Sequence, residues 1–353
     1  MTIKPGAFRF NTDSMKLEIF RGSANYSGSA SMAGIGTLAA GQWEEIQATS
    51  PDVLTGGTRG VFAIGSTGSP SLSYDATTQY ITVSTTGNAV DFGDTTDARG
   101  YGASFSSRTR GIFASGQDGN NLNVIDFITI ASTGTATDFG KISDVLVRYP
   151  TGLSDSTRGV LIGGWDGSAA REEMRYVTIS TTGNTVDFGN STAANYGGTG
   201  VSSQTRGVYA HGGSPSARVN IFDYITISTQ GNAADFGDNT ATTNGMFGTA
   251  NSVRAVFAGG YSPSAVNTAT YITIGTLGNA IDFGDITVAR GYGASAASPT
   301  RGAFIGGTIW PAGKNDIDYV QLMSTGNATD FGDLTDSKLG GGAFGCSNGH
   351  GGL

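Results

Sequence analysis

Two short motifs return six times along this chain of 353 residues, and both keep the same spacing. One is an Arg-Gly step, which becomes Arg254-Ala255 in one copy, and the other is Asp-Phe-Gly, about 30 residues further on. Successive copies lie 47 to 51 residues apart, a length that holds four short strands with their turns. The copies begin at Arg59, Arg110, Arg158, Arg206, Arg254 and Arg301, and at Asp91, Asp138, Asp187, Asp235, Asp282 and Asp330.

Each unit contains patterns typical of four strands. Small and apolar residues such as those at 101–107 favour a first strand, because small side chains suit the crowded axis of a ring. The repeated arginine begins a second strand that ends in glycines. A third strand alternates, as in Tyr80-Ile81-Thr82-Val83, and a Thr-Gly-Asn turn separates it from the Asp-Phe-Gly strand. We therefore predict an all-β fold, a β-propeller of four-stranded antiparallel blades.

Composition and charge exclude several classes of protein. Gly accounts for 57 residues and helix formers are scarce, so long helices are not expected. The net charge of −8 and the lack of any basic run argue against a nucleic-acid partner. Cys346 is the only cysteine, and neither His211 nor His350 has a second ligand at metal-binding spacing, so we expect no metal and no cofactor. We also expect no signal peptide and no membrane insertion, because the N-terminus lacks a charged and then apolar segment and no apolar run approaches ~18 residues.

The ends of the chain suggest how the ring closes. The first-strand pattern is expected a seventh time, at 341–347, and strand-like segments at 5–10, 16–20 and 42–46 match second, third and fourth strands. We therefore expect residues 1–353 to form one propeller of seven blades. Residues 1–50 supply N-terminal strands of the closing blade, 51–340 the six repeats, and 341–353 its inner strand, which removes exposed strand edges. The alternative is a six-bladed ring with residues 1–50 as a separate attachment segment.

The repeats at about 51–340 resemble the kelch repeat in their strand order. They carry Phe where kelch repeats usually carry Trp, at Phe92, Phe139, Phe188, Phe236, Phe283 and Phe331.

A second resemblance covers residues 6–46. Gly6-Ala7-Phe8-Arg9-Phe10-Asn11-Thr12, then Lys16-Leu17-Glu18 and Trp43-Glu44-Glu45-Ile46, is similar to a β-rich segment of tail and tail-fibre proteins of tailed bacteriophages, with an insertion from Arg21 to Gly41. The Gly/Ser/Thr-rich repeats also look like those of marine-phage virion proteins. This resemblance implies a protein located in the virion, with other tail proteins as partners and a host-surface glycan or receptor as a further candidate.

The repeated arginine and aspartate are lost together in the proposed N-terminal blade, where Pro5 and Gln42 stand at their positions. Joint loss predicts that the two side chains form buried ion pairs in the other blades, since a buried charge needs a partner.

No pattern predicts an enzyme. Six copies of Asp-Phe-Gly at blade spacing exclude the kinase magnesium motif, and the following residue, which is Lys141 or Asn190 in two blades, fails as a repeated calcium ligand. No Gly-x-Ser-x-Gly elbow marks a nucleophile. Convergent carboxylates on separate blades leave a glycan hydrolase open as an alternative.

The loops between second and third strands differ from one repeat to the next. They lie on one face of the predicted ring and carry aromatic residues among small polar ones, which is typical of a recognition surface and suits stacking on sugar rings. The other interpretation is sequence drift in unconstrained loops, each aromatic residue packing locally. We expect a non-enzymatic phage tail protein that contacts host or virion through this face, with a free-standing lectin as the alternative. The candidate binding residues are Tyr74, Trp165, Phe222, Tyr261 and Trp310.

Overall fold

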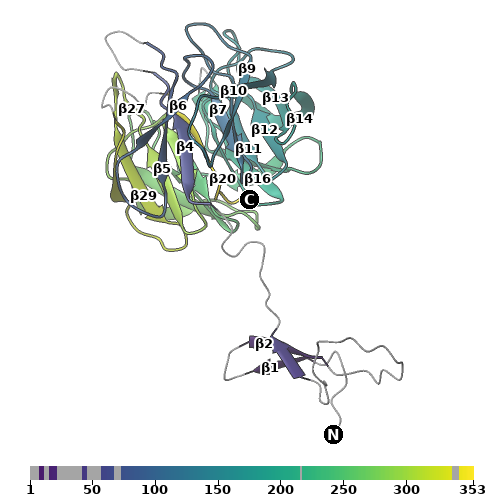
Figure 1. Cartoon of the computed structure of the whole chain (residues 1–353). Coiled ribbons are helices and arrows are strands. Elements are labelled where there is room, and N and C mark those ends of the chain that lie inside the picture. The colour runs from purple at the N-terminus through teal and green to yellow at the C-terminus, as the bar shows by residue number, and fades with distance from the viewer. Residues whose placement is uncertain are drawn as a thin grey trace. The chain divides into compact units, whose positions relative to one another are not determined.

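A computed structural model describes residues 57–66, 73–214, 217–335 and 342–353, together with three strands near the N-terminus. The chain divides into two compact units, Met1–Val53 and Leu54–Leu353. The first contains a three-stranded sheet of β1 (Phe8–Asn11), β2 (Lys16–Arg21) and β3 (Gln42–Glu45), in that order. The second is a β-propeller, and every regular element described in it is a strand (Figure 1).

The propeller has six blades, each a four-stranded antiparallel sheet. Blades 1 to 3 are β31 (Phe344–Ser347), β4 (Arg59–Ala63), β5 (Thr77–Thr82), β6 (Val90–Asp94); β7 (Ala103–Ser106), β8 (Arg110–Ala114), β9 (Val124–Thr129), β10 (Thr137–Lys141); and β11 (Thr151–Ser154), β12 (Arg158–Ile162), β13 (Arg171–Thr178), β14 (Val186–Asn195). Blades 4 to 6 are β15 (Thr199–Ser202), β16 (Arg206–Ala210), β19 (Ile221–Thr226), β20 (Ala234–Asp238); β21 (Phe247–Ala250), β22 (Arg254–Ala258), β23 (Thr268–Thr273), β24 (Ile281–Asp285); and β25 (Ala294–Ala297), β26 (Arg301–Ile305), β29 (Asp316–Gln321), β30 (Thr329–Asp333). Two small hairpins project from blades 4 and 6: β17 (Gly213–Ser214) with β18 (Ala217–Arg218), and β27 (Thr308–Ile309) with β28 (Ala312–Gly313).

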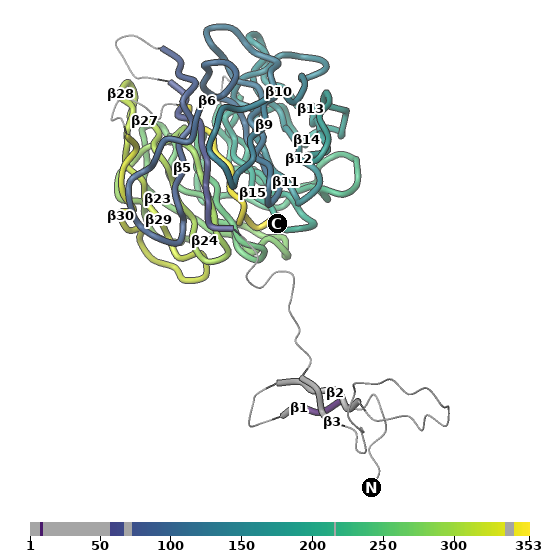
Figure 2. The backbone as a smooth tube through the Cα atoms, viewed as in Figure 1, coloured from purple at the N-terminus to yellow at the C-terminus, as the bar shows by residue number. Residues whose placement is uncertain are grey.

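The prediction of seven blades is wrong, and the six-bladed alternative is confirmed. β31 pairs with β4 of the first repeat, with Phe344 opposite Ala63 and Ser347 opposite Gly60, whereas β1, β2 and β3 pair with one another. Figure 2 shows the yellow C-terminal trace running among the blades of the ring. The described residues contain six inner strands and not the seven expected, because the first repeat lacks one of its own. β31 supplies that strand, and the joined ring leaves no open end.

The core lies between neighbouring blades. Alternate residues of each strand face the adjacent blade, so each apolar cluster combines two blades, as where Phe105 and Ile112 of blade 2 meet Leu161 and Val177 of blade 3. The six Asp-Phe-Gly phenylalanines are 2 to 3% exposed and pack edge to face on the third-strand aromatic ring of their own blade. Repetition of one interface six times builds the whole core.

The predicted ion pair between the repeated arginine and aspartate is wrong. The six aspartates are exposed on the outermost strands. Each arginine instead lies over the third-strand ring of its own blade, 4.2 to 4.7 Å from guanidinium carbon to ring centroid. Its Nη1 donates to a backbone carbonyl of the next blade at 2.8 to 3.3 Å, and Arg301 reaches Ser84 of blade 1 to complete the circle. The accepting carbonyls lie just after the third strand of the next blade, where the backbone needs a hydrogen-bond donor. The guanidinium therefore has hydrogen-bond acceptors without a carboxylate.

The Asp-Phe-Gly strand instead meets the glycine turn of the following blade. The turn glycine donates its N–H to the phenylalanine carbonyl, as from Gly134 to Phe92 at 2.8 Å, in all six interfaces. The motif glycine has a positive φ, and a Cβ on Gly93 would lie 2.4 Å from the Gly134 oxygen. The Asp-Phe-Gly motif and the glycine turn of the following repeat are therefore partners across the boundary between blades, which explains why both recur with one period.

Candidate functional site

Six equivalent residues, each just before an inner strand, form a closed ring around the propeller axis. The backbone N–H of each donates to the carbonyl of its counterpart in the preceding blade at 2.7 to 3.0 Å. The sixth bond, from Tyr101 to Gly342, completes the circle. We call these residues the axial ring; its members are Tyr101, Tyr149, Gly197, Gly245, Tyr292 and Gly342.

All six members of the axial ring have left-handed backbone conformations, with φ between 56° and 69°. Glycine adopts this conformation freely, but a residue with a side chain is strained there by roughly 1–2 kcal/mol. The glycines also leave space for the tyrosines: a Cβ on Gly342 would lie 2.4 Å from the Tyr101 ring, and one on Gly245 2.7 Å from the Tyr292 ring. The three tyrosine rings therefore lie together over the axis because the other three positions lack side chains.

The tyrosines of the axial ring are the centre of a larger aromatic surface. Tyr101 and Tyr149 have ring centroids 4.5 Å apart, and Tyr292 is 5.9 Å from Tyr149. Around them, Trp165 packs on Tyr196 at 5.5 Å, Tyr196 on Tyr149, and Tyr261 on Tyr292 at 5.7 Å, while Tyr74 lies beside Gly100. All seven residues are partly exposed, and we call them the aromatic face: Tyr74, Tyr101, Tyr149, Trp165, Tyr196, Tyr261 and Tyr292.

The five residues predicted to bind have different positions. Tyr74, Trp165 and Tyr261 belong to the aromatic face. Trp310 is 71% exposed in the turn between β27 and β28, and its backbone N–H donates to the Tyr261 hydroxyl at 3.0 Å. Phe222 is fully buried and stacks on Phe257, so the expectation that it lies on the surface is wrong. The reason is that β19 begins at Ile221, which turns the next residue into the core between blades.

Four residues of the aromatic face were not singled out from the sequence: Tyr101, Tyr149, Tyr196 and Tyr292. The small and apolar pattern at 101–107 predicts that Tyr101 lies in a first strand, whereas β7 begins at Ala103. The sequence does contain a signal for these residues: one position of the repeat is Tyr in three copies and Gly in the other three. Glycine at such a position indicates a positive φ, and tyrosine at a position of positive φ indicates that the aromatic ring has a function.

The phenols of the axial ring are neutral hydrogen-bond donors. Burial raises the pKa of Tyr149 above its usual value, with smaller contributions from Tyr101 and Tyr292, while Arg148 acts in the opposite direction. Burial likewise raises the pKa of Tyr292, and Arg218 opposes it. The hydroxyls therefore stay protonated around neutral pH and present O–H groups beside apolar rings.

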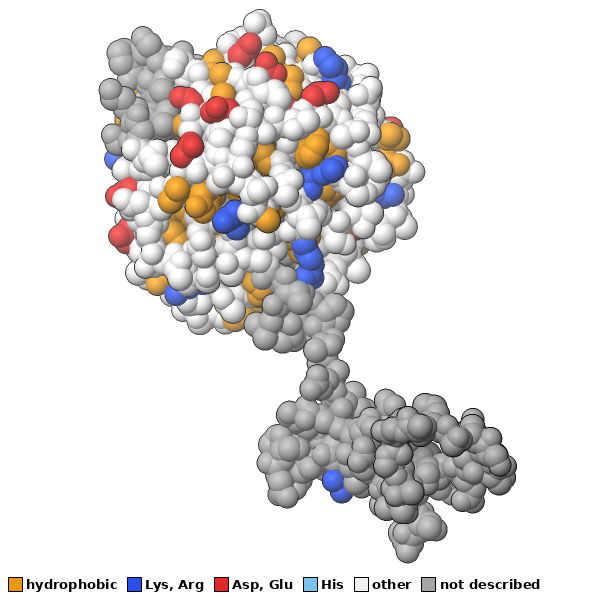
Figure 3. All heavy atoms as spheres, viewed as in Figure 1, with side chains coloured by type: hydrophobic (Ala, Val, Ile, Leu, Met, Phe, Trp, Pro, Cys, Tyr) orange, Lys and Arg blue, Asp and Glu red, His pale blue; other side chains and the backbone are white. Residues whose placement is uncertain are grey.

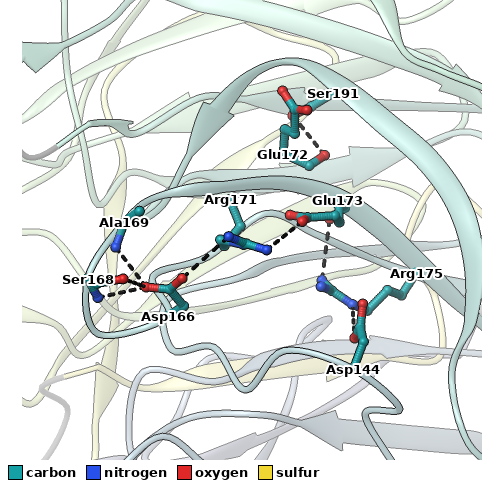
Figure 4. Close-up of polar contacts among 9 residues, drawn as sticks. All are labelled: Asp144, Asp166, Ser168, Ala169, Arg171, Glu172, Glu173, Arg175 and Ser191. Carbon is teal, nitrogen blue, oxygen red and sulfur yellow. Dashed lines mark hydrogen bonds and ion pairs between the residues drawn. The ribbon is translucent and has the colours of Figure 1, made fainter.

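Trp165 directly precedes a turn in the sequence, and the contacts of Asp166 and Arg171 that stabilise this turn are shown in Figure 4. Asp166 Oδ1 accepts the backbone N–H groups of Ser168 and Ala169 at 2.6 and 2.7 Å. These bonds, that of Ala169 first, lower the pKa of Asp166 to about 2. Its other oxygen is 3.5 Å from Arg171, which also bonds Glu173. The turn is thus fixed before any ligand arrives, which reduces the entropy lost on binding.

Below the axial ring, the inner strands surround a cavity of about 160 Å³. Most of its lining residues are Gly, Ala, Ser or Thr. Ser hydroxyls join successive inner strands, as from Ser154 Oγ to the Ser106 carbonyl at 2.9 Å. At the other end His350 Nε2 lies 3.0 Å from that same carbonyl, and burial lowers the pKa of His350 to about 4. Small side chains let six strands converge, so this region is structural.

Buried ion pairs do occur, but outside the repeated Arg-Gly and Asp-Phe-Gly motifs. Arg99 pairs with Asp126 and Arg290 with Asp318, each at 2.8 Å and almost completely buried, joining the linker between blades to a third strand. In blade 4 His211 Nε2 is 2.8 Å from Asp223, also fully buried. These carboxylates are inaccessible to a substrate. Among the residues that the structure describes, no group of three or more His, Cys, Asp or Glu side chains is placed to hold a metal ion.

The surface visible in Figure 3 is mostly backbone and uncharged polar side chains, with Lys, Arg, Asp and Glu in small separate groups. In the described part of the chain, no helix has the length and apolar character needed to cross a membrane. No protein-family model matches the sequence, and no curated protein is significantly similar to it.

Proposed function

We propose that this chain is a non-enzymatic binding propeller of a tailed-bacteriophage virion, and that its aromatic face contacts a saccharide of the host surface. One observation carries the binding role. Three tyrosines occupy strained positions where three repeats of the same chain use glycine without strain. Strain retained beside an available unstrained residue points to a functional use of the ring.

The chemistry of the aromatic face suits a sugar. Partly exposed aromatic rings offer apolar surface to the C–H faces of a pyranose, and the phenol O–H groups next to them donate hydrogen bonds to its oxygens. Few torsion angles are frozen when such rings bind, so little conformational entropy is lost. Hydrolysis would need paired accessible carboxylates, whereas Asp126, Asp223 and Asp318 are buried in structural pairs.

The virion assignment rests on the resemblance of residues 6–46 to phage tail segments and on the separate N-terminal unit, a suitable attachment module. A free-standing lectin would share the aromatic face but would be missing from particles. Mass spectrometry of purified phage particles distinguishes the two: the chain must be present in amounts comparable to those of other tail proteins.

The binding role is tested with the variant Tyr101→Gly/Tyr149→Gly/Tyr292→Gly. Glycine fits each position, because the other repeats place it there, and the strain relieved roughly offsets the lost ring contacts of about 0.5–1.5 kcal/mol each. We therefore expect an unchanged circular dichroism spectrum and loss of binding of labelled protein to host cells.

The control is Leu277→Ala, which removes an apolar side chain 58% exposed on the turn between β23 and β24, at the opposite face. It should bind like the parent. If the triple glycine variant also binds host cells like the parent, the aromatic face is not the contact surface. Incorporation of both variants into particles separates contact with the host from contact within the virion.

A further inference from the structure

Two arginines at the aromatic face lack acidic partners within the described residues. Arg148 directly precedes Tyr149 and pairs through its backbone with Trp165. Its guanidinium carbon is 5.9 Å from the Tyr149 ring centroid, and Nη1 donates to the neutral Gln117 Oε1 at 2.7 Å. Its Nε is buried without a hydrogen-bond partner. The Arg148 guanidinium thus lies beside the Tyr149 ring and has no carboxylate partner among the residues that the structure describes.

Arg218 occupies a similar position beside a different tyrosine. It lies on β18, is exposed, and donates from Nε to the neutral Asn244 Oδ1 at 3.1 Å. Asn244 directly precedes Gly245, where a Cβ would lie 2.7 Å from the Tyr292 ring, so the Asn244 bond holds Arg218 near this tyrosine. The axial ring therefore has a cation next to two of its three tyrosines.

Two other arginines of this region are bound to carboxylates. Arg171 bonds Asp166 and Glu173, and Arg175 bonds Asp144 (Figure 4). Asp118 accepts the backbone N–H of Asn120 in its own turn. In a chain of net charge −8, two arginines held by neutral amides beside an aromatic surface are an unusual concentration of uncompensated positive charge.

We propose that the aromatic face binds an acidic polysaccharide, with sugar rings on Tyr101, Tyr149 and Tyr292 and carboxylates of the sugar at Arg148 and Arg218. A guanidinium binds a carboxylate through two parallel N–H···O bonds, which a neutral sugar cannot accept in the same way. Two cations beside different tyrosines match a polymer that carries acid groups at regular intervals along its length. This inference rests on the proposed saccharide-binding function and specifies its ligand.

The test measures binding of the whole protein to immobilised polymers. The acidic probes are alginate, polygalacturonate and hyaluronan, and the neutral probes are dextran and galactomannan. We expect binding to at least one acidic polymer, weakening as salt is raised because the charges are exposed. Arg148→Gln/Arg218→Gln should lower that affinity at least about ten-fold, the effect of losing charge-assisted hydrogen bonds.

The matched control is Arg108→Gln, in the turn between β7 and β8 on the opposite face, which changes net charge without touching the site. It should bind like the parent. If the double variant keeps full affinity for the acidic polymer while the triple glycine variant loses it, the saccharide site stands and the acidic ligand is refuted. Equal binding of acidic and neutral polymers, or no binding to any acidic polymer, also refutes the acidic ligand.

Discussion

Replacement of Arg206 by Ala tests what the repeated arginine does. Its Nη1 donates to the Ile274 carbonyl of the next blade at 2.9 Å, and its guanidinium lies 4.7 Å from the Tyr224 centroid. A hydrogen bond from a charged group contributes about 1.5–3 kcal/mol, and the lower end applies because Arg206 is partly exposed. The cation–π contact adds about 0.5–1 kcal/mol. Together these predict a loss of roughly 2–3 kcal/mol in the free energy of unfolding.

The assay is chemical denaturation of the Arg206→Ala variant followed by fluorescence, with Asp235→Ala as the companion variant. Asp235 is exposed on β20, so its loss should change the free energy of unfolding by less than about 0.5 kcal/mol. A double-mutant cycle with Tyr224→Leu should give a coupling of about 0.5–1 kcal/mol. The reasoning is refuted if Asp235→Ala is as destabilising as Arg206→Ala, or if Arg206→Ala has no measurable effect.

Three further outcomes follow from the fold. Removal of residues 1–53 should leave the melting temperature of the propeller unchanged, because β31 closes the ring on β4; a large decrease measured by calorimetry would contradict six-bladed closure. Gly237→Ala should lower the melting temperature more than Gly231→Ala. Both glycines have positive φ, but only at Gly237 would the added Cβ meet a backbone oxygen, that of Gly278 at 2.6 Å. Equal decreases in melting temperature would refute this contact. The pKa of His350 is lowered from 6.5 to about 4 in the folded protein, so as the pH decreases the unfolded chain binds the proton first. The free energy of unfolding should therefore be unaffected above pH 6.5 and should decrease by up to about 3 kcal/mol as the pH is lowered from 6.5 to 4. His350→Gln should reduce that fall in acid unfolding curves, and an identical pH profile would show that His350 is not the group responsible.

Much of the blade was predictable from local sequence. Alternation in segments such as Tyr80-Ile81-Thr82-Val83 is a property of the strand itself, because successive side chains point to opposite faces. The period of about 48 residues predicts one blade per repeat, and six copies of the repeat predict six complete sets of second, third and fourth strands. These strands occur in the tertiary structure almost as predicted.

The partner of each repeated residue was not predictable in the same way. Arg206 and Asp235 recur at one period, yet the same period fits any pair of positions within a unit or across neighbouring units. The structure shows that the arginine contacts a carbonyl of the next blade and that the aspartate remains on the surface. Shared periodicity indicates a shared structural role and does not specify the contact.

Ring closure and the binding surface depended on the tertiary structure alone. A candidate inner strand at 341–347 was visible in the sequence, but only the geometry of a six-membered ring brings Ser347 opposite Gly60, almost the full length of the propeller away along the chain. Tyr101, Tyr149 and Tyr292 are likewise separated by whole blades, and a sequence shows them only as single aromatic residues before glycine-rich strands. They become one surface because six equivalent backbone groups bond in a circle around the axis, a cyclic arrangement that exists only when the last blade meets the first.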